Sequence, residues 1–130
     1  MFLNSETDYA IRIVSCLAEN NAITDAATVS EKTGVTPRYT LKILHRLTQS
    51  GIVKSFKGAK GGYVLARDAD KITLYDVYKV FCGDISISRC ENSQNVCTYP
   101  KGECYFRKTF EDVSQYMQDK FKEVTFAKEF

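Results

Sequence analysis

Three of the five cysteines in this chain are evenly spaced within one short stretch, at Cys90, Cys97 and Cys104. Six residues lie in each gap, and the stretch carries Asn, Pro and Gly instead of helix or strand formers. Thiolates on such a loop suit a soft metal or an iron-sulfur cluster, because the backbone is free to wrap around the site. The preferred interpretation is an iron-sulfur cluster, of the 4Fe-4S or the 2Fe-2S kind.

Three other uses of these thiols remain open at this point. Structural zinc usually takes closely spaced Cys-x2-Cys pairs and a fourth Cys or His, whereas the only histidine here is His45, far upstream. A reversible disulfide between two of the three thiols is the second alternative, and thiols without any cofactor are the third. The odd count of five cysteines argues against a closed disulfide framework.

Composition indicates the setting in which these thiols work. The 130 residues are 44% hydrophobic and 26% charged, as in one globular domain. The first residues lack the basic start and apolar run of a signal peptide, and no stretch approaches the roughly 20 apolar residues that span a bilayer. We therefore expect a cytoplasmic protein without a membrane partner, where clustered cysteines are more often ligands or redox thiols than structural bridges.

Two helices are predicted before residue 35. The stretch SETDYAIRIVSCLAEN has apolar residues at helical spacing, and Ser5 with Asp8 three residues later is typical of a capping box. The stretch TDAATVSEKTGV predicts a shorter helix, capped by Thr24 and ended by Gly34.

A third helix follows directly after the turn. Thr36 and Pro37 are a cap and a first-turn proline, Gly51 ends the pattern, and an inward stripe of Leu41, Leu44 and Leu47 is expected. The opposite face is polar and basic and consists of Arg38, Tyr39, Lys42, His45, Arg46 and Gln49. Two short helices joined by a glycine turn, the second with a basic face, are typical of a DNA-binding helix-turn-helix. A basic face that is merely solvated is the alternative.

The next stretch favours the DNA-binding interpretation. Two short runs, Ile52–Phe56 and Tyr63–Leu65, flank a glycine-rich tip that carries Lys57 and Lys60. Seven Lys or Arg and no Asp or Glu lie between positions 32 and 60, although the net charge of the chain is only +2. Lysines on such a tip attract the phosphates of nucleic acid. The order of elements predicts a winged helix-turn-helix domain.

The remainder of the chain is predicted to be helical on both sides of the cysteines. Thr73 and Asp76 form a capping box before ITLYDVYKVFCG, and Cys16 and Cys82 are expected to be small buried residues of their helices. After the cysteines, a long apolar stripe repeats every three or four residues, at Phe106, Phe110, Val113, Met117, Phe121 and Val124. So long a stripe predicts a homodimer interface, and a helix folded back on its own core is the alternative.

The fold class is accordingly mainly α with a small β-hairpin. We expect a winged helix-turn-helix region with its following helix over 1–83, a cysteine-rich cluster-binding loop over 84–104, and a dimerisation helix with a C-terminal tail over 105–130. No acid-base or substrate-binding constellation is present, so an enzyme is not expected. An iron-sulfur electron carrier would have no use for a recognition helix and a cationic wing.

The segments TDYAIRIV, TPRYTLKILHRL, KGAKGGYVLA and ITLYDVYKVFCG, together with the three-cysteine loop and the long last helix, resemble one family along the whole chain. The family is the iron-sulfur-binding winged-helix transcription regulators of the IscR and NsrR type. The resemblance implies a homodimer that binds pseudo-palindromic promoter sites in double-stranded DNA. It also implies a cluster in each protomer's loop, held near the partner's DNA-binding domain.

The resemblance implies a ligand set as well. The IscR type has a histidine three residues after its third cysteine, where this chain has Arg107, so that scheme cannot be carried over. The NsrR type uses an aspartate in the first helix of the other subunit, and Asp8 stands at the matching place. The metal ligands implied are therefore the three cysteines and Asp8, with a helix-capping role as the alternative for Asp8. Glu91 and Glu103 are the carboxylates of the loop itself.

By the same resemblance, the DNA-reading positions are Thr36, Arg38, Tyr39 and Lys57, to which the basic face adds Lys42 and Arg46 and the wing tip adds Lys60. The implied function is a transcription regulator, a repressor, that senses redox state, nitric oxide or iron-sulfur status through its cluster. A regulator that reads redox state by thiol oxidation without a cluster is the alternative.

Overall fold

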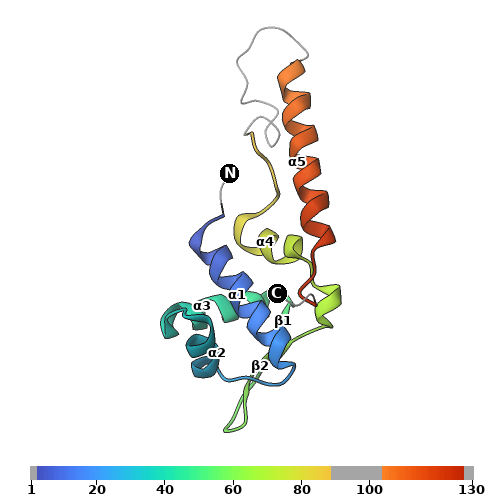
Figure 1. Cartoon of the computed structure of the whole chain (residues 1–130). Coiled ribbons are helices and arrows are strands. Elements are labelled where there is room, and N and C mark those ends of the chain that lie inside the picture. The colour runs from blue at the N-terminus through green and yellow to red at the C-terminus, as the bar shows by residue number, and fades with distance from the viewer. Residues whose placement is uncertain (1–2, 89–103, 128–130) are drawn as a thin grey trace.

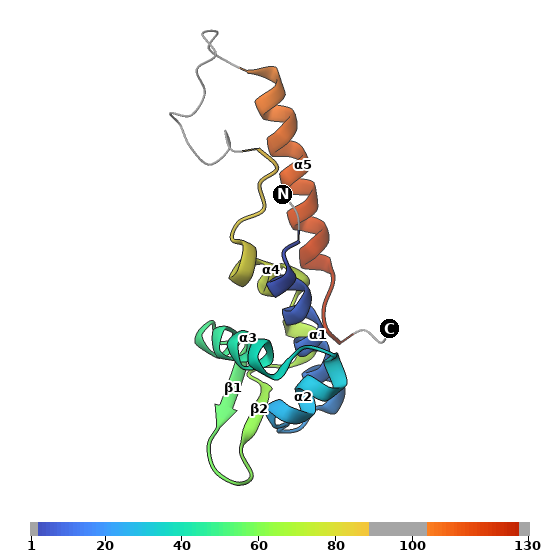
Figure 2. The same ribbon diagram turned by 90° about the vertical axis from the view of Figure 1, so that its left-hand side faces the viewer.

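The computed structural model describes residues 3–88 and 104–127, so Cys90 and Cys97 lie outside the described residues. In chain order the described elements are α1 Ser5–Asn20, α2 Ala26–Thr33, α3 Pro37–Gln49, β1 Val53–Phe56, β2 Gly62–Leu65, a short 3-10 helix Ala69–Lys71, α4 Leu74–Cys82 and α5 Tyr105–Glu123. Figures 1 and 2 show α1 to α4 and the hairpin gathered into one body, from which α5 projects. The expected class, mainly α with a small β-hairpin, is confirmed.

The N-cap residue of the first helix lies one position earlier than the sequence predicts. Asn4 is the cap of α1, and its Oδ1 accepts hydrogen bonds from the backbone N–H and the hydroxyl of Thr7, each at 2.8 Å. The predicted capping box of Ser5 and Asp8 is therefore wrong. Asn is as good a cap as Ser, and the side chain of Asn4 can bond the backbone N–H groups of the first turn, which have no partner within the helix. Asp8 is consequently not needed to cap the helix.

The hairpin is tied to the helices through the turn before α2. Asp25, not Thr24 as predicted, caps α2 by accepting from the N–H of Thr28 at 2.8 Å. Thr24 instead pairs with Tyr63 of β2 through two backbone hydrogen bonds of 2.9 and 2.8 Å. A side chain on Gly62 would lie 2.6 Å from the carbonyl oxygen of Thr24, so only glycine permits this approach.

The third helix begins as predicted, since Thr36 caps it and Pro37 occupies its first turn. It ends at Gln49, and Gly51 just beyond has a φ of +83°. The expected inward stripe is wrong at Leu41, which is 52% exposed. Six residues turn a helix through about 600°, so the side chains at 41 and 47 point about 120° apart and cannot share one face. Thr40 and Ile43 are fully buried instead.

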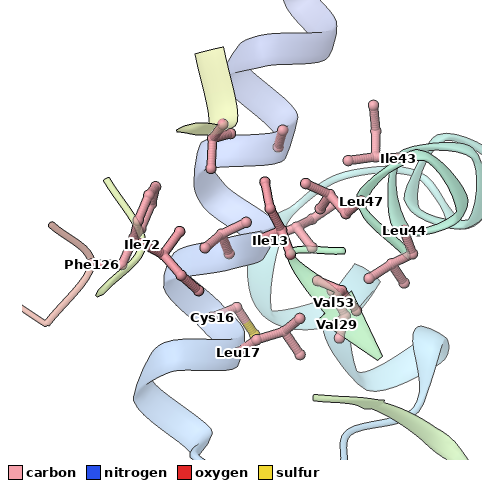
Figure 3. Packing of buried hydrophobic residues seen from close by; sticks show 14 of the residues in the cluster. Ile13, Cys16, Leu17, Val29, Ile43, Leu44, Leu47, Val53, Ile72 and Phe126 are labelled. Carbon is pink, nitrogen blue, oxygen red and sulfur yellow. The ribbon is translucent and has the colours of Figure 1, made fainter. Parts of the chain in front are cut away.

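The core forms around α1. Ala10, Ile13, Val14 and Leu17 of this helix are fully buried. Figure 3 shows Ile13 between the inner side chains of α3 on one side and the Ile72 and Phe126 pair on the other. Cys16 is buried in the same cluster, as expected, and burial raises the pKa of its thiol.

The last described segment returns to this core. The N–H of Phe126 donates to the carbonyl of Ile72 at 3.2 Å, and the N–H of Leu74 donates to the carbonyl of Val124 at 2.8 Å. The capping box of Thr73 and Asp76 at the start of α4 is confirmed. These bonds fix the base of α5 beside α4 and leave its other end to project from the body (Figure 1).

Candidate nucleic-acid interface

The outer face of α3 is solvent-exposed and basic. Arg38, Tyr39, Lys42 and His45 are all exposed on it, and the hydroxyl of Thr36 accepts from the N–H of Tyr39 at 3.4 Å. The Tyr39 ring lies against Tyr9 of α1, with 5.6 Å between the ring centroids. Burial of the opposite face holds α3 on the body, so its first turn faces solvent as a recognition helix requires.

The wing presents two further cations beside α3. Lys57 and Lys60 are exposed at the tip of the hairpin, whose first strand packs against α3. The N–H of Gly61 donates to the carbonyl of Gly58 at 2.9 Å and closes the tip into a tight turn. Figure 2 shows the hairpin extending beyond the helices. The tip can therefore approach a polyanion more closely than the helical body can.

The predicted DNA-binding cations fall into two groups. Within residues 3–88 and 104–127, Arg38, Lys57 and Lys60 take part in no ion pair. Lys42 and Arg46, in contrast, share Glu6 of α1, at 2.7 Å from Oε1 and 2.9 Å from Oε2 respectively. The hydrogen bond from Lys42 lowers the pKa of the Glu6 carboxyl.

Arg46 has two more contacts, both with α4. Its Nη2 donates to the carbonyl oxygen of Val80 at 2.6 Å, and its guanidinium lies 4.5 Å from the ring centroid of Phe81. Glu6 and Val80 are thus joined through one side chain of α3. Sequence patterns do not identify this group, because Arg46 is 40 residues from Glu6 and 34 residues from Val80. The basic face of α3 indicates Arg46, but no local pattern indicates Glu6 or Val80 as its partners.

Arg46 therefore stabilises the fold whatever else it contacts, whereas Lys42 pairs with Glu6 at the surface. Their charge is partly neutralised by Glu6, so we expect less attraction to phosphates from them than from Arg38, Lys57 and Lys60. All seven proposed DNA contacts remain predictions.

The described part of the candidate metal centre consists of Cys104 and Asp8. Cys104 is a partly exposed free thiol directly before α5. Asp8 lies on α1 with half of its side chain exposed, and its Oδ2 is 2.8 Å from Nη2 of Arg12. Described residues alone form no group of three or more metal-binding side chains, and Cys90 and Cys97 lie outside them. Thiolates are the donors that iron-sulfur clusters usually take, so Cys104 fits such a site on its chemistry, and the carboxylate of Asp8 enters it only by the resemblance.

Cys82, predicted to be buried, is only partly so. Its Sγ lies 3.0 Å from the hydroxyl of Thr7, at the point where the end of α4 meets the start of α1. Asn4 joins the same place, since its Nδ2 donates to the carbonyl of Phe81 at 3.3 Å.

The apolar stripe of α5 is divided between two environments. Phe121 packs edge-on against Tyr78 of α4, with ring centroids 5.4 Å apart. Phe106 is 67% exposed and Val113 is also exposed, while Phe110 and Met117 are half-buried. Tyr105 and Tyr116 add exposed aromatic surface that the stripe pattern missed. The projecting part of α5 thus leaves apolar area uncovered in a single chain.

In the part of the chain that the structure describes, every helix is too short or too polar to cross a membrane.

Comparison with known proteins identifies a family. The model of the Rrf2 family, described as an iron-dependent transcriptional regulator, matches residues 3–128. Protein aau3 of Rhizobium meliloti is 34% identical over 91 residues, which are 69% of this chain and 59% of that protein. The transcriptional regulator IscR of Escherichia coli is 30% identical over 93 residues, 70% of this chain and 57% of that protein. The chain thus spans less than two thirds of the length of these relatives.

One solved structure shows that the fold is shared. The chain is similar to CymR of B. subtilis, described as a global cysteine regulator, with a TM-score of 0.79. The two are 23% identical, and the match covers 97% of this chain and 93% of CymR. The expected winged-helix regulator fold is therefore confirmed, and the matching family and IscR are described as transcriptional regulators.

The contacts of Arg46 generate a prediction about stability. Arg46→Gln removes the bond to Val80, the stacking on Phe81 and one bond to Glu6, so we expect the free energy of unfolding to fall by about 1–2 kcal/mol. Lys42→Gln is the matched control, because its exposed pair should contribute less than about 0.5 kcal/mol. Urea denaturation measures both. Equal and small losses would show that Arg46 is an ordinary surface cation.

Proposed function

The chain belongs to the Rrf2 family of transcriptional regulators, and we propose that it binds promoter DNA as a homodimer under the control of an iron-sulfur cluster. The observation that carries the DNA-binding part is the set of exposed cations without an ion-pair partner among the described residues, Arg38, Lys57 and Lys60. Phosphates would supply the missing anions. Relatives named as transcriptional regulators support the same proposal.

The first turn of α3 is suited to enter the major groove. Thr36, Arg38 and Tyr39 lie at its N-terminal end, where recognition helices contact base edges and phosphates. Arg38 can donate two hydrogen bonds to a guanine edge, and Tyr39 can donate to a phosphate. Lys57 and Lys60 at the wing tip then reach the neighbouring backbone or minor groove.

The exposed aromatic surface of α5 supports the homodimer. A second copy would cover Phe106, Val113 and Tyr116, which single-chain packing leaves exposed. Dimers with two recognition helices bind two half-sites about one helical turn apart, so a pseudo-palindromic promoter site follows from the symmetry.

The cluster would be held by Cys90, Cys97 and Cys104, with Asp8 of the partner subunit as the fourth ligand. When bound, it supplies a centre that reacts with oxidants and nitric oxide. Asp8 would have to exchange its pair with Arg12, at 2.8 Å, for the metal. Half of its side chain is exposed, and capping does not employ it, so it is available.

Asp8 also lies one helical turn after Asn4 and directly after Thr7, and both of these residues contact the end of α4. A cluster that links the cysteine loop to α1 of the partner subunit would affect the distance between the two recognition helices. We propose that loss of this link switches a repressor between its DNA-binding states, in response to redox state, nitric oxide or iron-sulfur supply. Couplings between allosteric sites are about 1–3 kcal/mol, which corresponds to a change in operator affinity of about 5- to 150-fold.

A regulator that works by thiol oxidation without a cluster is the second candidate. The partly exposed free thiol of Cys104 favours it.

Substitutions of the exposed cations Lys57 and Arg38 give the first test of DNA binding. Lys57→Ala should weaken binding to all sequences alike and reduce the slope of log affinity against log salt by about one per bound lysine. Arg38→Ala should also relax base preference, at a cost of about 1–3 kcal/mol. Lys71→Ala, an exposed lysine on the 3-10 helix, is the control. Unchanged binding of both variants to a footprinted site would refute the proposed interface.

Substitutions on α5 test the homodimer. Phe106→Glu should produce monomers, because each phenylalanine buried between copies stabilises the dimer by about 1.5–3 kcal/mol and a charge there would be desolvated. Lys108→Glu, on another face of the same helix, should leave the dimer intact. Light scattering reads the mass of each variant, and a wild-type protein that is already monomeric at micromolar concentration would overturn the homodimer.

The cluster is tested by cysteine replacement. Anaerobically prepared wild-type protein should contain iron and sulfide, Cys104→Ala should lose both, and buried Cys16→Ala should retain them as the control. Operator affinity should change with the cluster in the same preparations. Asp8→Ala should give a spectrally altered cluster. A colourless wild-type protein with full DNA binding would favour the thiol-oxidation regulator, and a cluster-free variant that binds every site normally would reject the switch.

A further inference from the structure

Leu41 is the one leucine or isoleucine of α3 that is exposed. It is 52% exposed, whereas Ile43, Leu44 and Leu47 of the same helix are fully buried. Around it on the outer face lie Arg38 one turn before and His45 one turn after, both exposed. An apolar side chain is thus presented to solvent in the middle of an otherwise polar and basic face.

The fold does not explain this leucine. Leu41 belongs neither to the buried core cluster nor to the partly buried residues that pack against it. Exposed leucines are common on protein surfaces, so exposure alone carries no inference. The position of Leu41 does carry one. Leu41 stands on the second turn of α3, after Arg38 on the first turn and beside the wing with its exposed lysines Lys57 and Lys60.

The charges around Leu41 decide what kind of surface it meets. The exposed apolar surface beside Leu41 is small, because Pro37 and Tyr39 are the other exposed apolar residues of α3, and Arg38 and His45 stand next to them. A protein interface usually has a larger apolar centre than this. The major groove of duplex DNA combines phosphates and guanine edges, which suit the cations, with one apolar group on its base edges, the C5-methyl group of thymine.

We infer that Leu41 is a specificity-determining residue that contacts the C5-methyl group of a thymine in each half-site. The inference rests on the proposed DNA binding through α3. It assigns two complementary roles to one helix face: Arg38 supplies hydrogen bonds and charge, and Leu41 supplies an apolar surface that favours thymine over cytosine and over a base without the methyl group.

The test uses the duplex that the wild-type protein selects from a randomised library. Each thymine of that duplex is replaced in turn by deoxyuridine, which lacks only the methyl group. Wild-type affinity should fall about three- to ten-fold at one thymine of each half-site, as expected for one methyl group buried against a leucine. Leu41→Ala should bind the thymine and uracil duplexes equally well, with an affinity close to that of wild type on the uracil duplex.

Ile23→Ala is the matched control, since Ile23 is 47% exposed but lies between α1 and α2, and this variant should keep the full sensitivity to uracil. The wild-type measurement does not depend on how any variant folds. A selected duplex at which no thymine is sensitive overturns the inference, as does Leu41→Ala with undiminished sensitivity; both leave DNA binding itself standing. A library from which nothing is enriched refutes the proposed DNA binding and the inference together.

Discussion

Burial of one apolar stripe of α1 is the constraint on which the rest of the structure depends. Ala10, Ile13, Val14 and Leu17 are inaccessible to water because α2, α3, α4 and β2 all pack against this helix. Each of those elements must turn its own apolar face inward, so its polar face points outward. The exposed first turn of α3 is a consequence of this packing, and so is the hairpin beside it. The core therefore positions the candidate interface with DNA.

Charge adds a second level of organisation to the same helices. Glu6 of α1 pairs with Lys42 and Arg46, and Arg46 continues to the carbonyl of Val80 in α4. Three helices are thus joined at one end of α3, close to where Asn4 and Thr7 contact the end of α4. The chain leaves this junction toward the cysteine stretch. These contacts join the end of α4 to the recognition helix and are a physical route that the proposed regulation could use.

Local sequence patterns are sufficient to predict most helices and strands. They fail where a neighbouring residue can take the same role, and where a side chain contacts a residue far away in the sequence. The caps Thr36 and Thr73 were predicted because each has its bonding partner within three residues. The pattern favours Ser5 as the cap of α1, but Asn4 beside it has the same capping chemistry. Leu41 is predicted to be buried, but residues spaced by three point in steadily different directions around a helix. Glu6 as a partner of Arg46 could not be predicted, because 40 residues separate them. The division of the α5 stripe likewise depends on where α4 packs.

A crystal structure of the chain bound to the duplex that it selects tests DNA binding through α3 and the wing most directly. We expect two copies joined along α5, the first turn of each α3 in the major groove with Arg38 at a guanine edge or a phosphate, and Lys57 of each wing on the neighbouring backbone or in the minor groove. The bonds from Arg46 to Glu6 and Val80 should be intact. A complex in which the DNA lies on another face of the protein, with Arg38 and Lys57 in solvent, would contradict the account.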